Sequence, residues 1–250
     1  MSEQNFAKQI EPTESMSLAE TLTTGIFFEP ARTFEALRNR LRFLVAGLLV
    51  IVLSYGFFVT FAYRVGYENI ARAQIEASSR TVQLTPEQKE LAIQTQSRFR
   101  IIAYVTVPIV KAIGIAIGGA LFFLGVIALG KKFNYSQGLS VWTYSSLPPA
   151  FLSILISLVV LFVKAPEDLD LASTDFNLAH ANLGILVDSI AHPIIGAFLG
   201  SFDLFVFYGL FLAAVGIKKM SKLSSGGSWA IVITIWFITA LFKVVPAFFR

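Results

Sequence analysis

The chain has 250 residues, of which 55% are hydrophobic and only 14% charged, and its formal net charge is +4. Because a soluble protein must cover its surface with polar groups, this composition excludes most soluble enzymes and favours a protein embedded in lipid. The absence of cysteine excludes disulfides, thiolate metal sites and cysteine nucleophiles. The basic residues lie mainly beside apolar runs, which is typical of membrane proteins rather than of nucleic-acid binding.

The N-terminal part is polar and then becomes amphipathic. Residues 1–24 are rich in Glu, Ser, Thr and Gln, and we expect a disordered cytoplasmic tail there, followed by one membrane domain at 25–250. Pro30 suits the first position of a helix, and apolar residues recur after it at helical spacing. The pattern predicts an interfacial helix on the cytoplasmic leaflet. Its expected lipid-facing basic residues are Arg32, Arg38, Arg40 and Arg42.

Five apolar runs are long enough to cross a bilayer as α-helices. They lie at residues 43–63, 101–130, 141–163, 194–217 and 229–245. The sequence therefore predicts an all-α integral membrane protein with five transmembrane helices. Two short loops carry lysines and no acid, so we expect them in the cytoplasm, with the N-terminus inside and the C-terminus outside. These lysines are Lys131, Lys132, Lys218, Lys219 and Lys222.

A helix start precedes the second apolar run. Thr85, Pro86 and Glu87 supply a cap, a first-turn proline and an early acid, and Gln88 completes a capping box. The second span is therefore expected to begin as a water-exposed helix that projects outward.

Lys111 and Asp203 are the informative ionisable residues inside the predicted spans. A charge at membrane depth costs roughly 2.5–3.5 kcal/mol on insertion scales, so Lys111 and Asp203 need a reason to be there. Each shares a helix face with small residues, which let helices approach closely. We expect the second and fourth spans to pack together with Lys111 and Asp203 paired; the alternative is that Lys111 snorkels outward and hydroxyls cap Asp203. The expected packing glycines are Gly114, Gly118, Gly196 and Gly200.

The third span contains tandem prolines, Pro148 and Pro149, close to its cytoplasmic end. Prolines remove two backbone donors, so the freed carbonyls need other partners. The sequence predicts a helix kink at Tyr144, Ser145, Pro148 and Pro149, with the serine hydroxyls as local partners.

No group of residues matches a catalytic or metal-binding motif. His180, Asp188 and His192 have no recognised ligand spacing, and His192 suits a helix start because it precedes a proline. We therefore expect no enzyme activity, no cofactor and no metal.

Short motifs in three regions resemble the Yip domain family in its bacterial form. This family comprises five-span membrane proteins named for interaction with Ypt/Rab-type GTPases. The matching residues are Phe28, Glu29, Pro30, Thr33 and Phe34 before the first span, Tyr144, Ser145 and Pro148 in the third, and Asp203, Leu204, Phe205, Gly209 and Gly216 in the fourth.

The resemblance implies a noncatalytic protein of membrane organisation or trafficking. Its expected partners are membrane lipids, another membrane protein, a small GTPase or a second copy of the chain, in a bacterial cytoplasmic membrane. Two alternatives remain: a small transporter or channel subunit with a polar site at Lys111 and Asp203, and a lipid-modifying enzyme, for which we find no converging polar groups.

Overall fold

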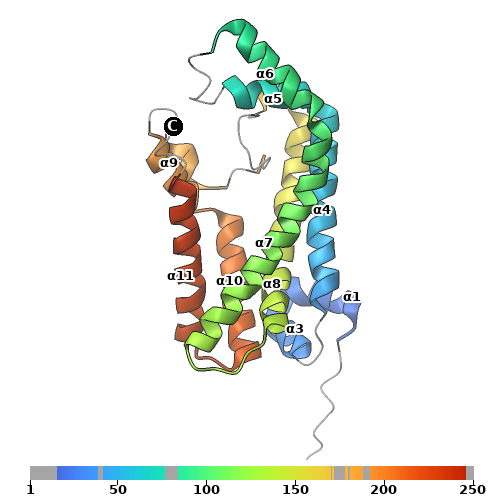
Figure 1. Ribbon diagram of the computed structural model, residues 1–250. Helices are drawn as coiled ribbons and strands as arrows, with labels where there is room; N and C mark the ends of the chain where they lie inside the picture. The colour runs from blue at the N-terminus through green and yellow to red at the C-terminus, as the bar shows by residue number, and fades with distance from the viewer. Residues whose placement is uncertain are drawn as a thin grey trace, which may run out of the picture.

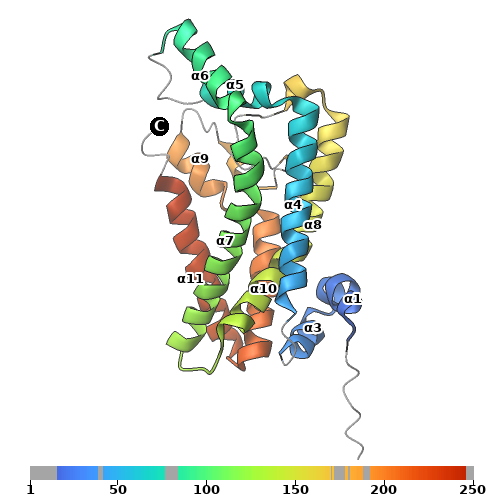
Figure 2. The same cartoon turned by 45° about the vertical axis from the view of Figure 1, so that its right-hand side comes forward.

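The computed structural model describes residues 16–38, 42–76, 84–169, 171, 178–179, 181–187 and 192–245. Long helices run side by side along one axis (Figure 1). One end carries α5 (Tyr67–Glu76) and α6 (Pro86–Arg98), and the other carries α1 (Leu18–Glu20) and α3 (Pro30–Leu37). The turns between α7 and α8 and between α10 and α11 lie at the same end as α3 (Figures 1 and 2). We call this the lysine-rich end, because its two turns and the last helical turn of α10 hold Lys131, Lys132, Lys218, Lys219 and Lys222.

Five helices in the described part of the chain are long and apolar enough to cross a membrane, which confirms the predicted number of spans. They are α4 (Phe43–Val65), α7 (Arg100–Ala128), α8 (Tyr135–Val163), α10 (Leu204–Ser221) and α11 (Ser225–Val244). The third begins six residues earlier than predicted, because Asn134 caps it through the backbone N–H of Gln137 at 2.8 Å.

The fourth span differs most from its prediction. Instead of one helix over 194–217, a short helix α9 (Pro193–Leu199) is separated from α10 by a non-helical break. The break is held by other elements: Trp236 of α11 donates to the carbonyl of Ser201 at 3.1 Å, and Leu204 N–H donates to that of Ala181 at 3.0 Å. His192 is the N-cap residue of α9, as its position before proline predicted.

The segment before the first span is folded from Met16 to Arg38. It contains α1 (Leu18–Glu20), a π-helical turn (Thr21–Gly25), α2 (Ile26–Phe28) and α3 (Pro30–Leu37). The expectation of disorder through residue 24 is therefore wrong for residues 18–24, where Ser17 and Glu20 form a capping box. Residues 1–15 lie outside the described residues. Pro30 occupies the first turn of α3, as predicted.

The opposite end carries a pair of short helices, α5 (Tyr67–Glu76) and α6 (Pro86–Arg98). Thr85 and Gln88 form the predicted capping box, and α6 leads directly into α7, so the expected helical start of the second span is confirmed. Arg72 joins the pair through Glu90 at 3.2 Å. Two short 3-10 helices, Pro166–Asp168 and Leu183–Leu186, lie in the connection between α8 and α9.

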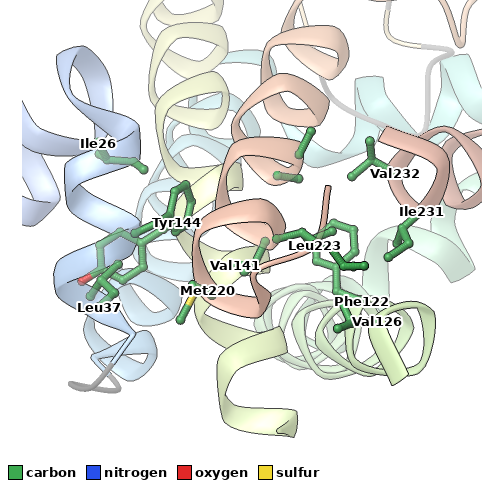
Figure 3. Close-up of a cluster of buried hydrophobic side chains, with 14 of the residues drawn as sticks. Ile26, Leu37, Phe122, Val126, Val141, Tyr144, Met220, Leu223, Ile231 and Val232 are labelled. Carbon is green, nitrogen blue, oxygen red and sulfur yellow. The ribbon is translucent and has the colours of Figure 1, made fainter. Parts of the chain in front are cut away.

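The largest group of buried apolar residues lies toward the lysine-rich end. It joins α3 to the spans and includes Phe34, Leu37, Tyr144, Ile217 and Met220. Figure 3 shows side chains from the N-terminal helices, α8, α10, α7 and α11 gathered in this cluster. A second cluster packs α4 against α8 nearer the other end, with Phe61 and Leu161 fully buried.

Candidate functional site

The motif residues of three distant segments meet where α3 docks onto α8 and α10. Phe34 of α3 is fully buried, and its ring lies so close to Gly216 of α10 that a Cβ there would be 2.9 Å away. Leu37 and Ile26 lie beside Tyr144 of α8 (Figure 3). Gly216 therefore provides the space into which α3 inserts its aromatic side chain.

Tyr144 brings a polar group into this junction. Its side chain is completely buried, and the hydroxyl has no hydrogen-bond partner among the described residues. Thr21 and Arg42 are polar residues close enough to influence this hydroxyl electrostatically. The Thr21 hydroxyl donates its proton to the carbonyl of Leu18 at 2.7 Å.

The tandem prolines lie inside α8, which continues through them as one helix. Ser145 and Ser146 donate to the carbonyl of Trp142 at 3.1 and 2.7 Å, and not to the carbonyls that the prolines leave free. Pro149 has no backbone N–H to donate to the carbonyl of Ser145. This carbonyl faces Gly209 of α10, and a Cβ on Gly209 would lie 3.6 Å from its oxygen. The prediction of serine hydroxyls as partners for the freed carbonyls is therefore wrong.

The predicted interfacial helix, which was expected to reach Arg42, is shorter and more buried than predicted. It ends at Leu37, and its apolar face packs into the protein core instead of facing lipid. Arg32 pairs with Glu29 at 3.1 Å on the surface, whereas Arg42 donates to the carbonyl of Met16 at 3.4 Å and thereby ties the N-terminal segment to the start of α4. Arg40 lies outside the described residues.

Arg38 instead joins a charged pocket that sequence reasoning missed. The pocket is lined by Glu35, Arg38, Lys218, Lys219, Lys222 and Leu223. In the sequence these lysines indicate only the orientation of a loop, because nothing there reveals that α3 lies against the end of α10. The feature of the sequence that could have indicated this pocket is the run of basic residues at the end of an apolar span.

The structure does not bring Lys111 and Asp203 together. Asp203 is the N-cap residue of α10, and its carboxylate accepts from the backbone N–H groups of Phe205 at 2.8 Å and Val206 at 3.2 Å. Lys111 is exposed on α7, and no ion pair links these two described residues. Since 18 helical residues span about 27 Å, α10 alone nearly crosses a hydrocarbon core of about 30 Å. Asp203 therefore marks the end of a span and not its middle.

Capping by Asp203 has a testable consequence. We expect Asp203→Ala to lower the free energy of unfolding by about 1 kcal/mol and Asp203→Asn to leave it nearly unchanged, because asparagine caps helices as well as aspartate. Thermal unfolding in detergent micelles measures both. In a double-mutant cycle, Lys111→Ala and Asp203→Ala should be additive. A large loss with Asp203→Asn, or clear coupling to Lys111, would contradict the capping role.

The expected packing glycines serve different contacts from those predicted. Gly118 lies against the indole of Trp142, so it packs α7 against α8, whereas a Cβ on Gly114 would meet nothing within 4 Å. Gly196 and Gly200 lie against Gly184 of the 3-10 helix Leu183–Leu186, whose Cβ would be 3.3 and 3.2 Å from them. The glycines of the second and fourth spans thus do not pack against each other.

Five apolar spans joined by short connections at the lysine-rich end define a polytopic α-helical membrane protein. The chain belongs to the Yip1 domain family, whose sequence model matches residues 24–245. This confirms the resemblance that the short motifs indicated. Comparison with curated proteins and with solved structures found no match.

Proposed function

We propose that this protein is a noncatalytic organiser of the membrane, acting in membrane organisation or trafficking through contacts at its lysine-rich end. That end would face the cytoplasm, as the positive loops indicate, and the membrane would be the cytoplasmic membrane of a bacterium. The contacts would be with anionic lipid, with another membrane protein or with a small GTPase, and a second copy of the chain is a further partner.

The observation that carries the proposal is the exposure of Phe28. This residue belongs to the motif Phe28, Glu29, Pro30 and is 82% exposed, although Ile26 and Phe34 on either side are completely buried. The segment that holds it ends in basic residues and lies at the base of the bundle (Figure 2). An exposed aromatic side chain in a segment that also carries basic residues is typical of a surface that inserts into a leaflet or receives a partner.

Photocrosslinking tests this role in the full-length chain. A photoreactive amino acid at position 28 in native membranes should capture one defined protein or an anionic lipid. Tyr63 offers a matched control, because it is also aromatic, is 90% exposed and lies at the far end of α4. Identical products from positions 28 and 63, or no product at position 28, would contradict a contact surface at the lysine-rich end.

A further inference from the structure

The lysine-rich end holds a shallow, open depression of about 430 Å³, and five of its six lining residues are charged. Two elements build it: Glu35 and Arg38 come from α3 and the residue after it, while Lys218, Lys219 and Lys222 come from the last turn of α10 and its C-cap. The docking of Phe34 against Gly216 fixes the position of one element on the other.

Positive charge is in excess in this pocket. Glu35 is the only acid in the lining, and it pairs with Lys219 at 2.5 Å. Lys218 donates to the hydroxyl of Ser225 at 2.7 Å, which supplies no opposite charge. No acid of the described chain lies within ion-pair distance of Arg38 or Lys222. Four basic groups thus share a single carboxylate.

Lys222 has a backbone conformation that glycine or asparagine adopts more easily than lysine. Lys222 ends α10 with φ at 58°, the left-handed conformation in which glycine or asparagine is usual. Helix C-termini favour nearby cations, which helps the fold to hold these side chains. The partial charge of a helix end does not neutralise them, so the pocket remains attractive to an external anion.

We propose that this pocket binds a phosphate monoester, carried either by a lipid headgroup or by a soluble phosphate. A monoester has a charge of about −1.5 to −2 at pH 7 and three acceptor oxygens, which suits a planar guanidinium beside several ammonium groups. A phosphodiester carries only one negative charge and leaves more of the pocket uncompensated. The inference rests on the proposed function only for placing the pocket at the cytoplasmic surface of the membrane.

Binding is measured on the full-length protein with two probes. Native mass spectrometry of the detergent-solubilised protein, titrated with short-chain phosphatidic acid or phosphatidylglycerol, compares a monoester lipid with a diester lipid. Phosphorus NMR line broadening with inorganic phosphate tests the soluble source. We expect one saturable phosphatidic acid molecule, bound at least about tenfold more tightly than phosphatidylglycerol. Saturable binding of phosphatidic acid but not of phosphate identifies a lipid headgroup, and saturable binding of phosphate supports a soluble ligand.

Charge variants locate the site. Arg38→Gln and Lys222→Asn should each weaken binding about tenfold; asparagine is chosen because it tolerates the left-handed backbone of Lys222. Glu35→Gln should strengthen binding, because it removes the competing carboxylate, and a misfolded variant would not do so. Lys131→Gln with Lys132→Gln is the matched control, since these lysines lie at the same end but outside the pocket.

Three results would overturn the proposal. The first is equal binding of the two lipids, and the second is equal weakening by the Lys131 and Lys132 control, because both describe a diffuse basic surface. The third is the absence of saturable binding of either phosphatidic acid or phosphate. Photocrosslinking at Phe28 is independent of these results, so the failure of this site and the failure of the proposed function are distinguishable.

Discussion

Gly138→Ala is expected to destabilise the protein by about 3 kcal/mol, because overpacking a close contact forces the backbone to shift. An alanine Cβ at this position of α8 would overlap the carbonyl oxygen of Gly119 in α7 and lie 3.2 Å from the backbone N of Phe123. Backbone atoms cannot turn aside as a flexible side chain can. The α7 and α8 helices should therefore separate locally, and unfolding by SDS titration of dodecylmaltoside micelles, followed by circular dichroism, should occur at lower SDS.

Gly114→Ala is the matched control in the same apolar helix as Gly119. Its Cβ would meet nothing within 4 Å, so we expect no loss of stability and a gain of up to about 0.5–1 kcal/mol from helix propensity. If Gly114→Ala destabilised the protein as much as Gly138→Ala, α7 would pack tightly along its whole length. The close contact between α7 and α8 would then not be confined to Gly118, Gly119 and Gly138.

Phe34→Ala should cost about 3–5 kcal/mol, because it removes a fully buried aromatic side chain and leaves a cavity beside Gly216. The effect should be largest on the docking of α3, so limited proteolysis should cut the segment before α4 much faster than in the unchanged protein. Chemical unfolding in micelles measures the loss of global stability alongside the cleavage rate.

Phe28→Ala provides the comparison for Phe34, since both residues lie in the segment before α4 and only Phe34 is buried. We expect its stability and proteolysis rate to be unchanged within about 0.5 kcal/mol. If both phenylalanine variants behaved alike, α3 would lie on the lipid surface, as the amphipathic pattern alone predicts, and the docked arrangement would be wrong.

Helix starts were predictable because they depend on interactions among a few residues that are neighbours in the sequence. The capping box of Thr85 and Gln88 and the proline at the start of α3 both follow from hydrogen bonds or sterics within one helical turn. The five spans follow from run length, since a hydrocarbon core of about 30 Å requires about 20 apolar residues. The capping box at Ser17 and Glu20 shows the same logic in a region whose polar composition indicated disorder.

The candidate site depended on contacts between segments far apart in the chain. Asp203 lies between two apolar stretches, so a hydropathy average joins α9 and α10 into one span; Trp236 and Ala181 show where the backbone of the break is satisfied. Glu35 and Lys219 are 184 residues apart and meet only because α3 docks against α10. No periodicity within either segment contains that information.

The sequence by itself determined which residues avoid water, how many helices cross the membrane and where several of them begin. The tertiary structure decided which apolar residues are buried in the protein and which stay exposed on its surface, as the burial of Phe34 and the exposure of Phe28 illustrate. The physical reason is that lipid tails are as apolar as a protein core, so hydrophobic patterning separates a residue from water without naming its new neighbour. Close packing at Gly118, Gly138 and Gly216 determines which helices contact one another and therefore which apolar residues are buried between them.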